Sequence, residues 1–323
     1  MRIIVFGLGA VGGVVAARLH QGGTDVVGVA RGAHLAAVKA NGLAVRSIEG
    51  VDNVRLPVVG GLSELTPQQD DVVLITTKTQ DAPAVHDALA AWNPGVAVVC
   101  GSNGVEQERM VLRRFARTYA MVVNLPAVLH TPGEVTALCH PLNALLDVGC
   151  FPSGIDAVAE EFAAVIAASP HLDSIADPNV MAKKYAKLIV NLGNAGEAAI
   201  GQGGRDAAIV KVATAEARTV YAAAGIELVD DADYRTRLGG LSFAIPPGAR
   251  FTGGSTWQSL ARGADSVEID YLNGEVVLLG RLHGVATPAN EVLQRLINRL
   301  SRQGSAGASL TVADLDALIP ASS

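Results

Sequence analysis

A glycine-rich turn near the start of the chain has the spacing that binds the phosphates of a dinucleotide. The sequence GLGAVG follows the apolar run RIIVF directly and opens a stretch with helical character. In such a turn Gly7 allows the tight bend, Gly9 lets the backbone approach a pyrophosphate, and Gly12 lets helix and strand pack closely. The helix N-terminus then attracts the phosphates. The expected cofactor-binding segment comprises Gly7, Leu8, Gly9, Ala10, Val11 and Gly12. The alternative is a tight turn in a glycine-rich protein.

The end of the second strand indicates which dinucleotide the turn would hold. NAD enzymes place a carboxylate there for the ribose hydroxyls, whereas NADP enzymes often place an arginine there for the 2′-phosphate. Here the strand ends in Ala30-Arg31, and Asp25 stands at its beginning. We therefore expect NADP(H) as the cofactor, with Arg31 as a ligand. The alternative is that Arg31 is an ordinary surface arginine.

A second group of polar residues interrupts the apolar run AKLIVNLGNA. Lys187, Asn191 and Asn194 fall at i, i+4 and i+7, a spacing that places three side chains on one face of a helix. Upstream Lys184 extends this stripe. A solvated helix face would explain the spacing. However, asparagine is a poor residue for a helix interior, and a solvated face more naturally carries Glu, Gln or Lys.

Composition excludes several classes of protein. Half of the 323 residues are hydrophobic and only 4% are aromatic, so the core must be built from small aliphatic side chains, which favours α/β architecture. The net charge of -6 and the absence of a basic cluster argue against nucleic acid as a partner. The three cysteines are far apart and without a CxxC motif, which is typical of a cytoplasmic protein rather than a disulfide framework. The apolar start also resembles a secretory signal, but its glycines are spaced for a turn. No other apolar run is long enough to span a membrane.

The order of apolar runs predicts two domains. Buried strands are expected at 2–6, 25–30, 72–77, 96–100 and 119–125, alternating with helices at 10–22, 81–92 and 105–116. This alternation indicates a doubly wound, Rossmann-type parallel sheet. Short extended pieces at 126–150 are expected to add antiparallel strands to that sheet. Helices are then expected at 179–200, 205–224, 255–262, 266–283 and 289–302, with one short helix in TVADLDALI. We assign 1–177 to a nucleotide-binding domain, 178–303 to an all-helical C-terminal domain and 304–323 to a tail.

With these elements in place, the chain resembles the 2-dehydropantoate 2-reductases, or ketopantoate reductases. The matching motifs occur in order over residues 1 to about 300 and comprise GLGAVG with Arg31, TTK at 76–78, SNG at 102–104, KLIVN at 187–191, EIDYLNG at 268–274 and HGVATP at 283–288. Each motif is short, but the ordered set is specific. The resemblance implies a Rossmann domain followed by a helical domain, and leaves a homodimer open.

The resemblance also implies roles for individual residues. Lys187 would be the catalytic acid in an interdomain cleft, and Glu268 would orient it and hydrogen-bond the substrate. Asn191 and Ser255 would bind the substrate, while Lys78 and Asn103 would flank the nicotinamide. The chemistry agrees, because hydride transfer to a keto carbon leaves an alkoxide that needs a cationic proton donor. The alternative for Glu268 is an exposed residue at a helix start.

Two departures from the family pattern concern the substrate. The family's second asparagine falls at position 195, where this chain has Ala195, with Asn194 one residue earlier. After Ser255 the family reads Gln-Asp, whereas STWQSL supplies Trp257 and then Ser259 in place of the acid. We expect a remodelled pocket that includes Asn194 and Asn103, reduces 2-dehydropantoate weakly, and gains activity on it from Ala195→Asn.

Three functions remain open on the sequence alone. The first is NADPH-dependent reduction of a small 2-oxo acid, chiefly 2-dehydropantoate to (R)-pantoate. The second is reduction of another 2-oxo acid on the same scaffold, and the third is a catalytically silent NADPH-binding sensor. Retention of Lys187, Asn191 and Glu268 argues against a sensor. His130, Cys139 and His140 lack metal-ligand spacing, so no metal is expected.

Overall fold

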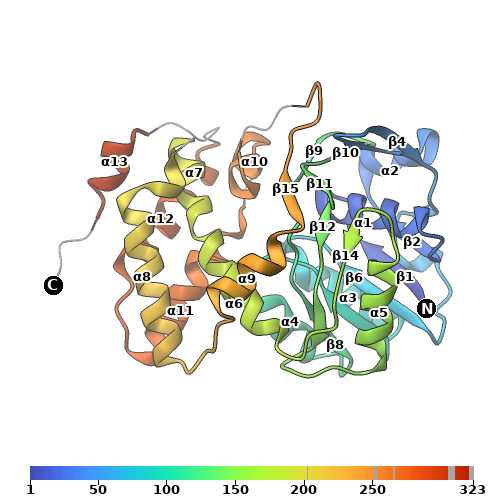
Figure 1. Ribbon diagram of the computed structural model, residues 1–323, viewed down its shortest axis with the longest axis horizontal. Helices are drawn as coiled ribbons and strands as arrows, with labels where there is room; N and C mark the ends of the chain where they lie inside the picture. Colours follow the sequence, from blue (N-terminus) through green and yellow to red (C-terminus); the bar gives the residue numbers. More distant parts are fainter. Residues whose placement is uncertain (202, 250–252, 265, 305–309, 320–323) are drawn as a thin grey trace. The chain divides into compact units, whose positions relative to one another are not determined.

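The computed structural model describes residues 1–323 except 202, 250–252, 265, 305–309 and 320–323 (Figure 1). Its contacts divide the chain into two compact units. The first unit comprises Met1–Asn103, Gln107–Lys183 and Asp230–Phe251. The second unit comprises Gly104–Glu106, Lys184–Val229 and Thr252–Ser323. Among the residues described, no helix is long and apolar enough to cross a membrane.

The first unit is built on a seven-stranded sheet with the order β13-β8-β7-β6-β1-β2-β5. All neighbouring strands run parallel except β13, which is antiparallel to β8. The strands are β1 (Arg2–Phe6), β2 (Val26–Val29), β5 (Val58–Val59), β6 (Asp71–Ile75), β7 (Ala97–Cys100), β8 (Thr118–Met121) and β13 (Val148–Cys150). The central strands are continuous apolar runs because both faces of a parallel sheet are covered. The doubly wound sheet expected from the sequence is confirmed.

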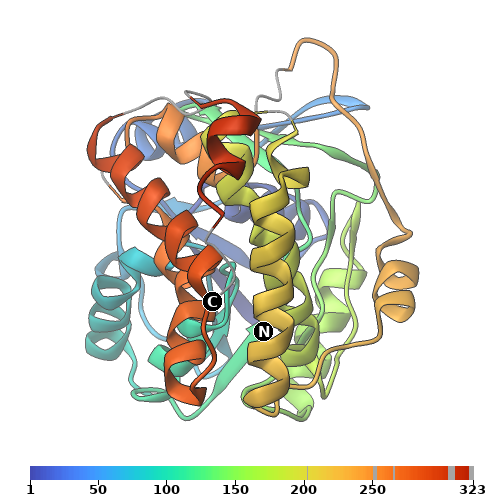
Figure 2. The same cartoon turned by 90° about the vertical axis from the view of Figure 1, so that its left-hand side faces the viewer.

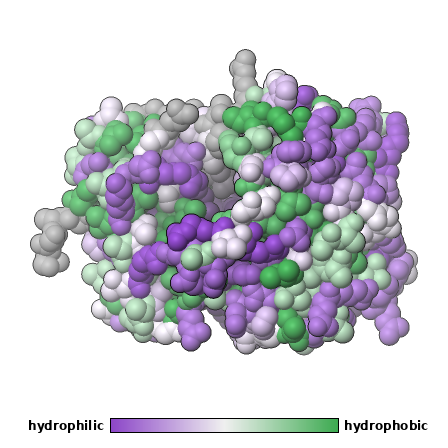
Figure 3. Space-filling model, viewed as in Figure 1, coloured by the Kyte–Doolittle hydropathy of each residue, from purple (hydrophilic) through white to green (hydrophobic). Residues whose placement is uncertain are grey.

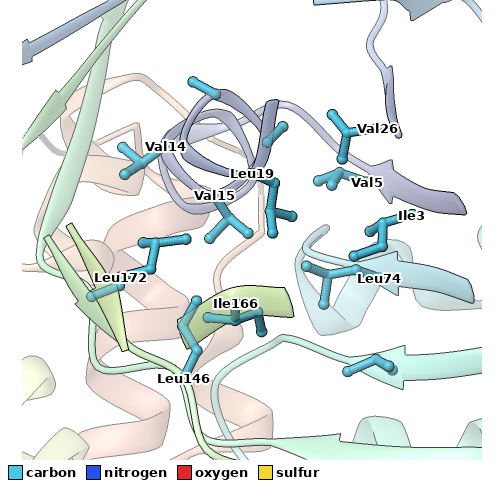
Figure 4. Close-up of a cluster of buried hydrophobic side chains, with 14 of the residues drawn as sticks. Ile3, Val5, Val14, Val15, Leu19, Val26, Leu74, Leu146, Ile166 and Leu172 are labelled. Carbon is cyan, nitrogen blue, oxygen red and sulfur yellow. The ribbon is translucent and has the colours of Figure 1, made fainter. Parts of the chain in front are cut away.

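Two apolar layers cover the faces of this sheet. On one face α1 (Ala10–Gln21) and α5 (Ala157–Ala167) pack against side chains such as Ile3, Val5 and Leu74 (Figure 4). On the other face lie side chains of α3 (Ala82–Trp92) and α4 (Glu106–Leu112). The first unit also contains α2 (Gly32–Asn41), η1 (Leu62–Glu64) and η2 (Thr79–Asp81). The small residues of α1 allow it to pack closely on the sheet, as expected for a chain with so few aromatic residues.

The segment 126–150 differs from the expected extension of the main sheet. Only β13 joins that sheet, whereas β9 (Ala127–Thr131) and β10 (Glu134–Ala137) belong to a separate sheet with the order β4-β3-β10-β9. Its other strands are β3 (Leu43–Ser47) and β4 (Gly50–Val54). Gly133, with φ of +86°, turns β9 back onto β10, and β10 then pairs in parallel with β3. Two short pairs complete the unit, β11 (Cys139–Pro141) with β15 (Leu241–Phe243) and β12 (Ala144–Leu145) with β14 (Leu172–Asp173).

Residues 230–249 follow part of the helical sequence but belong to the first unit by their contacts, whereas the expected division at 177/178 assigns them to the helical domain. This segment contains α9 (Asp231–Leu238), whose hydrophilic outer side is visible in Figure 3, and β15. Arg237 of α9 donates to both oxygens of Asp147, with Nη2 at 2.6 Å from Oδ1. Lys183 Nζ lies 2.7 Å from the other oxygen, and Asp147 is only 3% exposed. Burial would raise the pKa of Asp147, but the hydrogen bonds from Arg237 and Lys183 hold it below its usual value.

The second unit is helical, as expected, but two of its helices are interrupted. The expected helix at 179–200 consists of α6 (Val180–Asn191) and α7 (Gly193–Ile200), which are separated at Leu192. The expected helix at 266–283 consists of a 3-10 turn, η4 (Glu268–Tyr271), and α11 (Asn273–His283). Leu272 breaks it with φ of -114° and ψ of -92°, so Glu268 does not continue the face of α11.

The other helices enclose a core of small aliphatic residues. They are η3 (Gly204–Asp206), α8 (Ala208–Ala223), α10 (Ser255–Ala261), α12 (Pro288–Arg302) and α13 (Val312–Asp316). The helices α8, α11 and α12 pack against one another (Figure 2). The apolar stripe of α12 supplies Leu293, Leu296, Ile297 and Leu300 to the core. The expected short helix in TVADLDALI is confirmed as α13.

Candidate active site

The glycine turn is a rigid structure that depends on the absence of side chains. Gly7 has φ of +108°, and its carbonyl accepts a hydrogen bond of 2.7 Å from the Thr76 hydroxyl. A Cβ on Gly12 would lie 2.1 Å from the Gly7 oxygen, which no real contact allows. Leu8 is buried and lies against Gly28 of β2. The geometry is therefore consistent with the roles predicted from the sequence, in which Gly7 allows the bend and Gly12 allows close packing.

The start of α1 has the features of an anion site. A Cβ on Gly9, the residue that precedes α1, would meet nothing within 4 Å, so the backbone is open there. No side chain caps this helix end and no acidic residue lies in its first turn, which leaves the positive end of the helix dipole uncompensated. Ala10 and Val11 begin the helix and are partly exposed. The turn therefore fits a dinucleotide pyrophosphate.

Three neighbouring strands end at the same edge of the sheet. Phe6 of β1 pairs with Ile75 of β6, and Ile75 pairs with Cys100 of β7. Because parallel strands share their carboxyl edge, the segments that follow them carry Lys78 and Asn103 to the edge that holds the glycine turn. The strand order reverses between β1 and β6, where open α/β sheets bind their ligands. The first unit thus brings together the expected cofactor-binding segments.

Arg31 lies at this edge too, because it follows β2, which pairs with β1 on the other side. Its side chain is exposed, and it makes no hydrogen bond or ion pair with the described part of the chain. Asp25 precedes β2 and is therefore at the opposite edge. No carboxylate follows Val29 directly, so the position lacks the acidic residue that NAD enzymes place there.

Lys187 is the chemically distinctive group of the second unit. It lies near the middle of α6 and is partly buried. Its pKa is lowered to about 7, mainly by burial and in smaller part by the ammonium of Lys184 one turn earlier, while the carboxylate of Glu268 in η4 opposes both effects. A lysine with such a pKa exchanges a proton near neutral pH, as a general acid must. The structure thus brings Lys187 and Glu268 within electrostatic range of each other.

The predicted substrate ligands have different surroundings in the second unit. Asn191 is partly exposed at the last position of α6. Asn194 is buried, and its Oδ1 accepts a hydrogen bond from Arg205 Nη2. Ser255 is the first residue of α10, directly after Gly254, whose N–H donates to Glu197 Oε1 at 3.1 Å.

The two departures from the family pattern prove to be packing residues. Ala195 is 0% exposed and belongs to the apolar cluster with Ala198, Leu260 and Val267. Ser259 is buried, and its hydroxyl donates to the Ser255 carbonyl at 2.8 Å, within the same helix. Both positions are thus buried, so an asparagine at position 195 would place its amide in an apolar cluster.

Arg205 and Glu197 were not predicted from the sequence. Arg205 follows the glycine-rich stretch GQGG, whose composition indicates a loop. The only signal in the sequence for a functional role is its positive charge next to an apolar helix. Its Nε donates to Glu197 Oε2 at 2.8 Å. The two side chains therefore connect α7 to the start of α10.

The expectation that no metal is bound concerned His130, Cys139 and His140. The side chain of His130 lies outside the described residues. Cys139 is buried, which raises its pKa to about 11 and disfavours the thiolate that metals bind. Across the described residues no group of three or more His, Cys, Asp or Glu could hold a metal ion.

Comparison with known proteins finds relatives that match most of the chain. The family model "Ketopantoate reductase PanE/ApbA" matches residues 3–152, and the model of the family's C-terminal part matches residues 179–301. The 2-dehydropantoate 2-reductase of Caulobacter vibrioides is 32% identical over 92% of this chain and 98% of its own length. That of Pyrococcus horikoshii is 26% identical over 92% and 96%.

Solved structures show the same fold. A ketopantoate reductase of this family from Ralstonia eutropha has a TM-score of 0.75 at 26% identity, covering 94% of this chain and 99% of its own. A D-mandelate dehydrogenase, solved with NADH and anilino(oxo)acetate, has a TM-score of 0.78 at 23% identity, with coverage of 94% and 99%. The chain therefore belongs to the ketopantoate reductase PanE/ApbA family and is an oxidoreductase that acts on 2-oxo acids.

Proposed function

We propose that the protein reduces a 2-oxo acid with NADPH, and that 2-dehydropantoate is the first substrate to test. The observation that carries this proposal is Lys187, a partly buried lysine with a pKa lowered to about 7 beside Glu268. Surface lysines keep a pKa near 10.4 and serve poorly as proton donors at neutral pH. Relatives named 2-dehydropantoate 2-reductase share the scaffold over more than nine tenths of their length.

The reaction needs a hydride donor and a proton donor. A nicotinamide cofactor would supply the hydride to the keto carbon. Lys187 then gives its Nζ proton to the carbonyl oxygen as negative charge develops there, and Glu268 keeps the ammonium charged and oriented. A preorganised cation at this oxygen contributes most to the rate because its charge is needed only in the transition state.

Asn191 and Ser255 are proposed to bind the carboxylate and oxygen atoms of the substrate, with Asn194 as a further ligand through its amide nitrogen. For the cofactor, Gly7 to Gly12 would hold the pyrophosphate. Lys78 and Asn103 would lie toward its nicotinamide end. Arg31 would pair with the 2′-phosphate, which favours NADPH over NADH.

A second candidate is reduction of a different 2-oxo acid on the same scaffold. It is favoured by Ala195, which is packed into the core where the family places an asparagine. Without this asparagine the protein would make one hydrogen bond fewer to 2-dehydropantoate, which costs about 1 kcal/mol of binding free energy. The protein would then discriminate less strongly between 2-dehydropantoate and other 2-oxo acids.

Steady-state kinetics with a panel of 2-oxo acids and both cofactors test the proposal. We expect reduction of at least one 2-oxo acid with NADPH, and a decrease in kcat of at least ~10²-fold in Lys187→Ala with NADPH binding retained. The exposed Lys211 on α8 offers a matched control, and Lys211→Ala should behave like the parent. Nearly normal turnover by Lys187→Ala would reject Lys187 as the acid.

A further inference from the structure

A group of four residues in the second unit forms a set of hydrogen bonds that we name the Arg205 clamp: Asn194, Glu197, Arg205 and Gly254. Arg205 Nε donates to Glu197 Oε2 at 2.8 Å, and its Nη2 donates to Asn194 Oδ1. The second oxygen of Glu197 accepts the Gly254 N–H at 3.1 Å. One guanidinium and one carboxylate thus connect η3, the first turns of α7 and the start of α10.

The clamp acts on the residues adjacent to the proposed substrate ligands. Arg205 Nη1 lies 3.4 Å from the carbonyl oxygen of Val190, the residue before Asn191. Gly254, bonded through Glu197, is the residue before Ser255. Asn194, itself a proposed ligand, is bonded directly. Each ligand on the substrate side is therefore held by Arg205 either directly or through a residue next to it in the chain.

Close packing fixes the position of Arg205. A Cβ on Gly196 would lie 2.0 Å from the Gly204 oxygen, so α7 and η3 touch through their backbones. A Cβ on Gly254 would lie 2.8 Å from Glu197 Oε2 and 3.2 Å from Arg205 Nη2. The Gly254 backbone has φ of -67°, which any residue adopts, so only the clamp opposes a side chain there. The glycines at these points bring the elements close enough for a single arginine to reach all of them.

The clamp contributes little to global stability. The Arg205 side chain is 43% exposed and that of Glu197 is 14% exposed. Ion pairs with such access to water contribute a small part of the free energy of folding. The fork of the guanidinium, however, can bond several acceptors in fixed directions, which the ammonium of lysine cannot do. The exposure and geometry therefore agree better with positioning than with stability.

We infer that Arg205 and Glu197 are positioning residues that set the spacing between Asn191, Asn194 and Ser255, and thereby the affinity for the 2-oxo acid. This inference rests on the proposed function, because it takes these three side chains as substrate ligands. The clamp does not touch Lys187, so it affects KM for the 2-oxo acid far more than kcat. Neither the family's motifs nor the expected site residues include Arg205 or Glu197.

The test compares Arg205→Met, Arg205→Lys and Glu197→Gln with the control Arg295→Met, which breaks an exposed ion pair to Glu291 in the same unit. We expect KM for the best 2-oxo acid to rise about 5- to 10-fold in all three clamp variants, the factor that one lost hydrogen bond gives. The kcat, the Kd for NADPH and the melting temperature should stay close to those of the parent. The control should leave KM unchanged.

A double-mutant cycle separates positioning from a merely structural role. If the clamp acts by placing Ser255, then Arg205→Met should raise KM much less in a Ser255→Ala background than in the parent. Additive effects would overturn the inference, as would an unchanged KM in Arg205→Met. If Ser255→Ala and Asn191→Ala both leave KM unchanged, the ligand assignment and the clamp are overturned, while Lys187→Ala still decides the proposed reaction independently.

Discussion

The low pKa of Lys187 predicts a pH dependence that no ordinary lysine would produce. The acid must be protonated to act, and burial lowers its pKa to about 7. Hence kcat/KM for the 2-oxo acid should be constant below pH ~6 and fall tenfold per pH unit above ~7, since each unit removes nine tenths of the remaining ammonium. At pH 9 the rate should be about 100-fold below its plateau. A lysine with a normal pKa would keep the profile flat to about pH 10.

The two charged neighbours of Lys187 provide an internal check, because they act in opposite directions. Lys184 lowers the pKa and Glu268 raises it, so Lys184→Met should move the midpoint of the profile to higher pH and Glu268→Gln to lower pH. At about 6 Å and an effective dielectric constant of about 20, one unit charge is worth at most ~3 kcal/mol, or about two pH units. Screening by water reduces this to about one unit.

The assay follows the loss of NADPH absorbance at saturating cofactor between pH 5.5 and 9.5, with the acid decomposition of NADPH subtracted. The pH at the midpoint of each profile is compared between the parent and the variants, because Glu268→Gln also lowers the absolute rate. A parent profile that stays flat to pH 9 would refute Lys187 as an acid of low pKa. Midpoints that shift in the same direction in both variants would refute the electrostatic assignment.

Thermal unfolding measures the same property without substrate. The pKa of Lys187 is lower in the folded state than in the unfolded state, so unfolding takes up a proton between pH 7 and the unfolded value of 10.5, and Lys187 costs stability at low pH. The full shift corresponds to at most ~5 kcal/mol, and partial exposure reduces it to ~1–2 kcal/mol. Lys187→Met should therefore melt higher than the parent at pH 6.5, by an amount that vanishes near pH 10.

Three further predictions concern the cofactor and the core. Arg31→Asp should raise KM for NADPH and leave that for NADH similar or lower, and equal use of both cofactors by the parent would contradict the role of Arg31. Gly9→Ala should weaken cofactor binding without loss of stability because its Cβ meets nothing, whereas Gly12→Ala should reduce both; titration and melting curves distinguish them. Ala195→Asn should destabilise the protein by ~1–3 kcal/mol through a buried amide, with no gain on 2-dehydropantoate; a rise in kcat/KM for it would restore the original expectation.

The first unit could be predicted where buried elements follow one another locally. The strands β1, β6 and β7 are buried and are apolar apart from Arg2 and Asp71 at their starts, and the glycine turn after β1 has a spacing that few other structures need. The sheet containing β3, β4, β9 and β10 could not be predicted, because its pairing joins residues far apart in sequence. In β4 four of the five residues are exposed, so no apolar pattern marks it as a strand. The return of α9 and β15 to the first unit depends on Arg237 meeting Asp147, a contact that periodicity does not reveal.

In the second unit the helices could be predicted from the sequence, but the interruption between α6 and α7 could not. Polar and apolar positions continue through Leu192 with little change, so the sequence predicted one helix where α6 ends and α7 begins. Lys187 and Asn191 lie before the break, and their common face could be predicted. Among the residues after it, Asn194 bonds to Arg205 and Ala195 lies in the apolar core, and helical periodicity alone does not specify these contacts.

The different surroundings of Asn194 and Ala195 affect how the proposed substrate ligands of this protein compare with the family pattern. On an ideal helix, Asn194 points about 100° away from position 195 and cannot replace a missing asparagine there. In the structure the two residues have different roles: Ala195 packs with Leu260 in the core, whereas Asn194 accepts a hydrogen bond from Arg205. If Asn194 binds substrate as proposed, this chain differs from the family pattern in how a ligand is held as well as in the number of ligands. Because the proposed ligand Asn194 is held by a partly exposed arginine, we expect its displacement to cost little stability, and we expect a different 2-oxo acid to be accommodated there while Lys187 and the glycine turn remain unchanged.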